Sequence, residues 1–368
     1  MHELKAIVQS YDQAIRSGSK CALATIVHVH GSSYRKPGAR MLITENGDLT
    51  GAISGGCLEG DALKKALHVM YQNKPMVQTY DTMDDDDAIL GVGLGCNGII
   101  KVLIEPIDPT DDVSNPIEMI RYLIQDRECG CIVTLFNTNF ESSIHIGTKF
   151  AAKANHHDGR GRKDFLSDQS CVDSFINKSI SNKESQWHDF EQVSCKMCAF
   201  FQFVPPSIQL LVAGAGIDVV PLAEMAHILG WDTIIVDGRP NYINKNPYSA
   251  SCAIQLAKPE EVLSKIQLDE YTYAALMTHN YNYDKKLLSI LLAYDVLPYI
   301  GMLGSKTKII RMLDEFNEEG LHISEEKMRI IHSPIGLDIG AENAGEIAAS
   351  IIGEIQAIYA KKERNTML

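Results

Sequence analysis

A buried strand that ends in a glycine turn constrains the fold of this chain more than any other feature. Residues 208–213 are largely apolar, and Gly214-Ala215-Gly216 follows them directly. The pattern then predicts a helix over residues 220–229 and a strand over residues 233–236 that ends at Asp237. Strand, glycine turn, helix and second strand form the opening of a dinucleotide-type fold. We therefore expect a C-terminal Rossmann-type parallel sheet with helices on both faces.

The glycine turn carries part of the dinucleotide fingerprint. Gly214 and Gly216 allow a phosphate to approach the helix N-terminus, and Asp237 lies 21 residues after Gly216, where an acid would bind a ribose hydroxyl. Val219 stands in place of the third glycine, and Pro221 follows shortly. Nucleotide binding and a purely structural turn therefore both stay open.

The sequence predicts further strands of the same sheet at residues 273–277, 299–302 and 328–331, and a loop follows each, at residues 278–284, 303–308 and 332–340. The carboxyl ends of parallel strands share one edge, which is where ligands bind in open sheets. We expect a pocket for an anionic ligand there, although turn and capping roles would explain each loop singly. The candidate residues in these loops are His279, Ser305, Lys306 and Asp338.

The segment Ser54-Gly-Gly-Cys-Leu-Glu-Gly-Asp61 places a thiol, Cys57, where a strand passes into a helix. Gly55 and Gly56 permit a tight turn, and the first-turn N–H groups of the helix would lower a thiol pKa and attract anions. A second thiol, Cys96, lies in the glycine-rich stretch 93–98. Each cysteine is a candidate metal or sulfur ligand or nucleophile, and a small buried side chain is the alternative.

The loop at residues 31–40 combines hydroxyl groups and three cations. Ser32, Ser33, Arg35 and Arg40 suit a phosphate or a carboxylate, and a solvated hairpin loop is the alternative. The acidic run at residues 84–87 lacks a calcium-loop pattern, so we expect a solvated loop there.

Composition narrows the class of partner. The chain has 368 residues and a net charge of −13, which disfavours nucleic acid as a partner. No apolar run reaches the length of a membrane span, and no signal peptide is evident, so we expect a cytoplasmic protein without membrane partners. Nine irregularly spaced cysteines are typical of thiols in a reducing compartment.

The sequence predicts an α/β chain in three parts. Residues 1–107 are expected to form an N-terminal α+β module, with strands at residues 21–29, 39–44, near 52 and at 99–105. Residues 108–204 are expected to form a small α+β connecting region with an exposed linker near residues 153–182. Residues 205–368, which begin at Pro205-Pro206, are expected to form the Rossmann-type domain. Residues 132–151 faintly echo residues 26–43, too weakly to predict a duplication.

Both ends of the chain resemble the XdhC/CoxI family, accessory factors of molybdenum hydroxylases such as xanthine dehydrogenase. The N-terminal resemblance lies in residues 31–40, 54–61, 80–82 and 93–96. The C-terminal resemblance lies in residues 214–216, 277–279, 303–305 and 333–341. Ile217 departs from the family, because many relatives have histidine there.

The resemblance implies a chaperone of purine catabolism, without turnover of its own. It would bind molybdopterin cofactor as cargo, assist its sulfuration and insert it into an apo-hydroxylase. It also implies a homodimer, with a cysteine desulfurase as a further partner. We interpret Cys57 and Cys96 as contacts at the molybdenum end and Arg35, Arg40 or a helix N-terminus as contacts for the pterin phosphate. An NAD(P)-dependent oxidoreductase and a scaffold without a small ligand are the alternatives.

Overall fold

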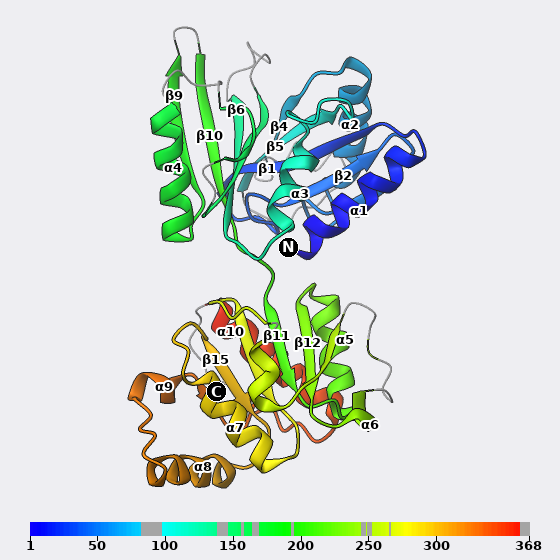
Figure 1. The fold of residues 1–368 in the computed structure, drawn as a ribbon. Coiled ribbons are helices and arrows are strands. Elements are labelled where there is room, and N and C mark those ends of the chain that lie inside the picture. The colour runs from blue at the N-terminus through cyan, green and yellow to red at the C-terminus, as the bar shows by residue number, and fades with distance from the viewer. Residues whose placement is uncertain are drawn as a thin grey trace. The chain divides into compact units, whose positions relative to one another are not determined.

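The computed structural model describes residues 1–81, 98–137, 146–155, 158–163, 169–192, 195–243, 248, 252–264 and 266–360. The chain divides into two compact units, Met1–Pro206 and Ser207–Leu368 (Figure 1). No helix among these residues is long and apolar enough to cross a membrane.

The first half of the N-terminal unit is an antiparallel five-stranded sheet with the order β3-β2-β1-β5-β4. Helix α1 precedes the sheet and α2 connects β3 to β4. The expected strands and the helix after Cys57 are present, whereas β4 was not expected. The elements are α1 (His2–Arg16), β1 (Cys21–Gly31), β2 (Arg40–Thr44), β3 (Leu49–Gly51), α2 (Glu59–Gln72), β4 (Met76–Asp81) and β5 (Gly98–Ile107).

The second half repeats this arrangement. Its antiparallel sheet has the order β8-β7-β6-β10-β9. Along the chain, helix α3 precedes the sheet and helix α4 connects β8 to β9. The two halves therefore share one topology, which the faint sequence echo was too weak to predict. The elements are α3 (Pro116–Ile124), β6 (Gly130–Asn137), β7 (Gly147–Lys153), β8 (Arg160–Gly161), α4 (Gln169–Asn182), β9 (Gln186–Gln192) and β10 (Cys195–Val204).

Helix α4 corrects part of the sequence prediction. An exposed connection was expected near residues 153–182, but residues 169–182 form a helix. Val172 and Ile176 lie one turn apart on that helix, and both are buried against the second sheet. Phe175 and Ile180 pack on the same cluster, so positions 172, 175, 176 and 180 carry a helical spacing that the sequence prediction overlooked.

Strand register defines which positions of the two repeats are equivalent. Thr25 of β1 lies opposite Arg40 of β2, and Thr134 of β6 lies opposite Thr148 of β7. Thr25 and Thr134 are both fully buried. Arg40 and Thr148 therefore occupy matching places in the two sheets.

Apolar clusters hold the N-terminal unit together. Side chains of the first sheet pack on α2, and those of the second sheet pack on α4. A third cluster, which includes Val27 and Phe200, lies between the two sheets. Helices α1 and α3 pack against each other and against strands of both sheets. The result is a sheet-on-sheet core in which residues of both repeats meet.

The C-terminal unit is a parallel sheet with the order β13-β12-β11-β14-β15-β16, which confirms the predicted fold class. Helices α5 and α10 pack on one face, and α7 and α8 pack on the other. The strands are β11 (Gln209–Ala213), β12 (Asp232–Asp237), β13 (Ala253–Leu256), β14 (Thr272–Leu276), β15 (Tyr299–Met302) and β16 (Ile331–His332). The helices are α5 (Val220–Ile228), α6 (Pro240–Ile243), α7 (Tyr281–Leu291), α8 (Lys306–Glu318), α9 (Glu325–Arg329) and α10 (Ala344–Tyr359).

The last strand is shorter than the sequence predicts. A strand was expected over residues 328–331, but α9 extends to Arg329 and β16 begins at Ile331. The Ser324 side chain caps α9 by accepting a hydrogen bond from the Lys327 N–H, which favours a helix there.

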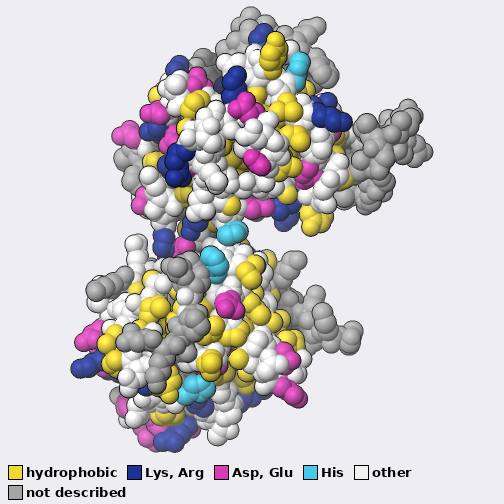
Figure 2. Space-filling model, turned by 90° about the vertical axis from the view of Figure 1, so that its right-hand side faces the viewer, with side chains coloured by type: hydrophobic (Ala, Val, Ile, Leu, Met, Phe, Trp, Pro, Cys, Tyr) yellow, Lys and Arg dark blue, Asp and Glu magenta, His cyan; other side chains and the backbone are white. Residues whose placement is uncertain are grey.

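Figure 2 shows hydrophobic side chains gathered on one face of the C-terminal unit. Large apolar residues of this unit with more than half of their surface exposed are Ile217, Ile228, Leu256, Ile310 and Ile339. Ile228 ends α5 and Ile310 lies in α8, so these residues belong to both faces of the sheet and are not one patch.

Candidate functional site

The loop before α2 is held by its own side chains. The Glu59 carboxylate accepts hydrogen bonds from the backbone N–H groups of Ile53, Ser54 and Leu58, at 3.2, 2.7 and 3.1 Å, and from the Ser54 hydroxyl. Ser54 Oγ in turn accepts from the N–H groups of Gly56 and Leu58. Burial opposes ionisation of Glu59, but these hydrogen bonds hold its pKa below the usual value. The N–H groups that these bonds engage lie in the loop before α2, which begins at Glu59, so the loop is fixed from within by its own side chains.

Cys57 lies half-buried within this loop as a free thiol. Gly56 has a φ of +112°, which glycine adopts without strain. The second predicted thiol, Cys96, lies outside the described residues.

The cationic loop and the thiol loop are adjacent. A Cβ atom built on Gly55 would lie 3.7 Å from ring atoms of Tyr34. Tyr34 is 70% exposed, and its ring lies beside the Gly55 backbone. Ser33 donates a hydrogen bond to the Arg35 carbonyl within the loop, and Ser32 is exposed. The loop at residues 31–40 and the thiol loop are thus neighbours at Tyr34 and Gly55.

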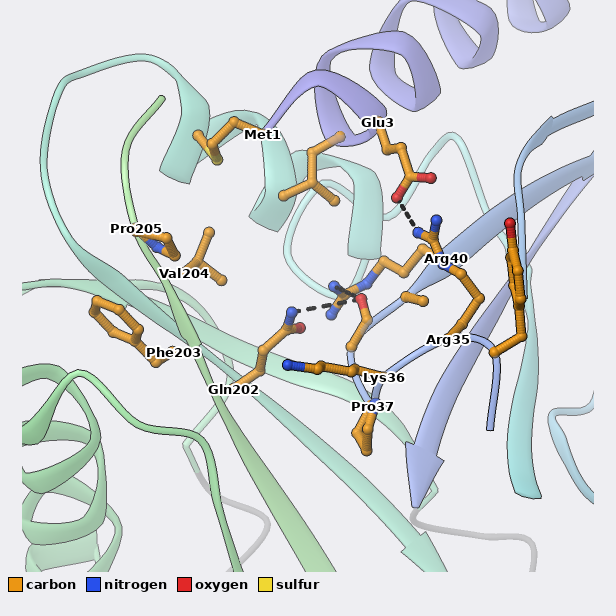
Figure 3. Close-up of a pocket in the computed structure, with 14 residues that line it drawn as sticks. Met1, Glu3, Arg35, Lys36, Pro37, Arg40, Gln202, Phe203, Val204 and Pro205 are labelled. Carbon is orange, nitrogen blue, oxygen red and sulfur yellow. Dashed lines mark hydrogen bonds and ion pairs between the residues drawn. The ribbon is translucent and has the colours of Figure 1, made fainter. Parts of the chain in front are cut away.

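A pocket of about 420 Å³ opens beside this loop (Figure 3). Its walls are the start of α1, residues 34–40 and the end of β10. Arg35 and Lys36 lie at the wall, and Arg35 forms an ion pair with Glu3. Tyr34 lines the pocket and also contacts Gly55, so the pocket and the thiol loop share one side chain.

Arg40 lines the same pocket and is only 1% exposed. Its Nη1 donates to the Gly38 carbonyl at 3.0 Å, and Gln202 Nε2 donates to the same oxygen at 3.4 Å. Within the described chain, Arg40 Nε and Nη2 and Gln202 Oε1 have no hydrogen-bond partner. Burial lowers the pKa of Arg40 to about 10, and the negative charge of Glu105 partly opposes that shift. A buried cation with unused donors therefore faces this pocket.

In the C-terminal unit, Asp237 is buried and fully engaged. Its carboxylate accepts from the Ala215 N–H at 2.9 Å and from the backbone N–H, Nε and Nη2 of Arg239. These bonds hold its pKa below the ordinary value, although burial acts in the opposite direction. Arg239 also lies over the Tyr242 ring, 3.8 Å from its centroid. In this arrangement Asp237 fixes the glycine turn, and a ribose hydroxyl would have to displace one of these bonds.

The glycine turn is close to protein atoms. A Cβ atom on Gly214 would strike the Met277 carbonyl, and one on Gly216 would strike the Asp218 carboxylate. Asp218 Oδ2 lies 2.9 Å from His279 Nε2, so the loops after β11 and β14 do meet. The small residues here serve close packing of the chain, and an acid lies near the turn where a pyrophosphate would bind.

The other predicted residues of this edge are dispersed. Ser305 precedes α8 and makes no capping hydrogen bond with its side chain. Lys306 is the first residue of α8, Asp338 lies in the loop after β16, and both are exposed. Lys308 instead extends inward, where its Nζ contacts Asp284 Oδ2 at 2.7 Å. Among the described residues, no group of three or more His, Cys, Asp or Glu side chains could hold a metal ion.

Comparison with known proteins identifies the family. A family model described as XdhC Rossmann domain matches residues 210–355, and one described as XdhC and CoxI family matches residues 14–81. A Bacillus subtilis (strain 168) protein, named as a probable subunit of xanthine dehydrogenase, is 33% identical over 344 residues, which cover 94% of each chain. The chain belongs to the XdhC and CoxI family.

Two further relatives of this XdhC and CoxI family protein extend over nearly its whole length. The molybdenum cofactor insertion chaperone PaoD of Escherichia coli (strain K12) is 22% identical, over 99% of this chain and 91% of the relative. A crystal structure described as a xanthine dehydrogenase from Bacillus halodurans has a TM-score of 0.74 at 28% identity and covers 98% of both chains. The two-unit architecture is therefore shared with a solved structure.

Sequence reasoning missed two residues of this XdhC and CoxI family protein that shape the pocket and its surroundings. Gln202 lines the pocket, and Glu105 is the buried acid whose charge acts on Arg40. Glu105 could have been noticed, because it is a charged residue within the apolar strand that ends at Ile107. Gln202 gave no such signal, since its contact with Gly38 depends on how the two sheets pack.

Proposed function

We propose that this chain binds the molybdenum cofactor as cargo, assists its sulfuration and inserts it into a molybdenum hydroxylase such as xanthine dehydrogenase. The observation that carries the proposal is the neighbourhood of a free thiol and a cationic pocket, joined through Tyr34. One end of the cofactor suits the thiol, because molybdenum and its dithiolene sulfurs are soft partners of thiols. Its other end suits the cationic pocket, because a phosphate binds guanidinium groups.

In this proposal each N-terminal residue has a role toward the cargo. Cys57 and Cys96 contact the molybdenum or its sulfur ligands, and Arg35 and Arg40 attract the phosphate. The glycines of the thiol loop and the hydroxyls of Ser32 and Ser33 let the cargo approach the backbone. The protein performs no turnover, and it acts in purine catabolism.

Protein partners are the other part of the proposal. An insertion chaperone must contact its apo-hydroxylase, and a cysteine desulfurase would supply the sulfur. The apolar side chains gathered on one face of the C-terminal unit support a protein interface (Figure 2). We propose a cytoplasmic homodimer that meets these partners.

The experiment uses protein purified from a host that makes molybdopterin. Wild-type protein is expected to carry pterin fluorescence and molybdenum and to activate an apo-hydroxylase. Cys57→Ser should activate the apo-hydroxylase at least about tenfold less than the wild type, because the thiol contact to molybdenum or its sulfur ligands is removed. Cys171→Ser is the matched control, because Cys171 is also half-buried but lies in the second repeat. If the wild type carries neither pterin nor molybdenum, the proposal is wrong.

A second candidate is an NAD(P)-dependent oxidoreductase. The glycine turn favours it, and so do the names of two relatives, which refer to xanthine dehydrogenase. Against it, Asp237 is engaged by Arg239, and Asp218 places a negative charge at the turn. Saturable binding of NADH or NADPH at less than about 1 mM, with redox turnover, would favour this candidate.

A further inference from the structure

The two repeats of the N-terminal unit meet through a pair of equivalent contacts. Glu105 lies opposite Leu23 in the first sheet, and Gln202 lies opposite Ile132 in the second. Leu23 and Ile132 belong to the same apolar cluster between the repeats. Each polar side chain reaches the start of the second strand of the other repeat: Glu105 contacts Thr148, and Gln202 contacts Gly38.

In the first of these contacts, between Glu105 and Thr148, both carboxylate oxygens have hydrogen-bond partners; we call this contact closed. Glu105 is 6% exposed and accepts hydrogen bonds from the Thr148 N–H at 2.8 Å and from the Thr148 hydroxyl at 2.6 Å. Both oxygens of the carboxylate are therefore satisfied by the other repeat. Gly147 lies against the same carboxylate, because a Cβ atom at this position would come within 3.1 Å of Glu105 Oε2.

In the equivalent contact around Gln202, some buried polar atoms have no hydrogen-bond partner within the described residues; we call this contact open. Arg40 takes the place that Thr148 has in the other repeat, so a cation stands where the closed contact has a small neutral residue. Arg40 Nε and Nη2 and Gln202 Oε1 find no partner within the described residues. Leaving buried polar groups unpaired is destabilising, and the penalty is larger for a charged group.

The pocket at the open contact carries excess positive charge. Arg35, Lys36 and Arg40 line it against one carboxylate, Glu3, which is already paired with Arg35. Figure 3 shows Arg40 and Gln202 directed toward the same carbonyl from opposite walls. The volume of about 420 Å³ is that of a small-molecule site and exceeds the space that one water needs.

We propose that this pocket is the binding site for a phosphate monoester, with Arg40 as the residue that binds the phosphate oxygens. The guanidinium offers two unused N–H donors in a planar fork, which matches two oxygens of a phosphate. Gln202 Oε1 accepts a hydrogen bond from the hydroxyl of the monoprotonated phosphate, a form that prevails below the second pKa of about 6. At neutral pH the dianion prevails, and Arg40 supplies the donors that bind it. If the proposed function holds, the ester is the terminal phosphate of the pterin; the same chemistry would bind free phosphate.

The test is calorimetric titration of the full-length protein with inorganic phosphate and with phenyl phosphate, near neutral pH and at low salt. Wild-type protein should bind phenyl phosphate saturably and more tightly than inorganic phosphate. Arg40→Met should weaken this binding about tenfold or more, because a hydrogen-bonded charge is lost. Arg40→Lys keeps the charge without the fork and should be intermediate. Arg16→Met, at an exposed arginine of α1, should bind like the wild type.

Three results would overturn the assignment. They are an absence of saturable binding in the wild type, equal or tighter binding of inorganic phosphate, and wild-type affinity in Arg40→Met. Should Arg40→Met fail to fold, Lys36→Met tests the exposed wall of the same pocket and should weaken binding about threefold. Unchanged affinity in Lys36→Met would then count against the site.

The site and the proposed function fail separately. If wild-type protein binds phenyl phosphate through Arg40 but carries no pterin or molybdenum from a producing host, the pocket stands and the proposed cargo does not. If Arg40→Met is loaded with cofactor as fully as the wild type, the pocket assignment is wrong while the proposed function stands.

Discussion

Gly38 is the position at which a single methyl group tests how the two repeats meet. Its φ is +92°, and a Cβ atom there would lie closer than 3.0 Å to the Gln202 amide. Gly47 has the same φ of +92° but would place its Cβ in open space. The two glycines therefore differ in the close contact and share the backbone conformation.

The expected loss in the free energy of unfolding has two parts, the left-handed backbone conformation and the close contact with Gln202. Alanine in a left-handed conformation costs about 1–2 kcal/mol, so Gly47→Ala should lower the free energy of unfolding by that amount. Gly38→Ala also displaces the Gln202 side chain, and loss of its hydrogen bond to the Gly38 carbonyl adds about 0.5–1.5 kcal/mol. The total for Gly38→Ala is then about 1.5–3.5 kcal/mol. In a Gln202→Ala background the added cost should vanish, which gives a coupling energy of about 0.5–1.5 kcal/mol.

The assay can follow the N-terminal unit alone. The chain has two tryptophans, Trp187 in the N-terminal unit and Trp231 in the C-terminal unit. In a Trp231→Phe background, urea unfolding followed by Trp187 fluorescence reports the first unit, because Trp187 stacks on Phe200 and donates to the Val27 carbonyl. Equal costs for Gly38→Ala and Gly47→Ala, or an unchanged cost in the Gln202→Ala background, would refute this account of the contact.

Two further predictions concern buried acids. Burial raises the folded-state pKa of Glu105, so its contribution is fully present below the unfolded pKa of about 4.3 and is lost as pH rises through the folded pKa. The stability of Glu105→Gln relative to wild type should therefore improve between about pH 4 and 7, and a constant difference in urea midpoint would contradict this. Asp284 is fully buried and accepts from the Thr278 hydroxyl at 2.5 Å and from Lys308 Nζ at 2.7 Å. Asp284→Asn should destabilise the C-terminal unit by about 3 kcal/mol, because it leaves the Lys308 charge without its partner; Trp231 fluorescence in a Trp187→Phe background measures it, and a loss below about 1 kcal/mol would show that solvent screens the pair.

Some of the site could be predicted from local sequence, and some could not. Arg35 and Arg40 are indicated together because both lie in a loop with hydroxyls and glycine, and loop composition is a local property. Which of them is buried is not local: Arg40 is 1% exposed because β2 turns it between the sheets, while Arg35 remains at the wall. The spacing between Gly216 and Asp237 likewise could not reveal that Arg239 binds the Asp237 carboxylate.

The sequence alone determined the parallel C-terminal sheet, because an apolar strand, a glycine turn and a helix are consecutive and their pattern is set by neighbours in the chain. It also determined the thiol loop, whose Ser54 and Glu59 are five residues apart. The tertiary structure decided which side chains face the pocket. Gln202 meets Gly38 across 164 residues of sequence, and that contact exists because two repeated sheets pack face to face. Pairing over such a separation depends on the whole core, so no local pattern could have indicated it.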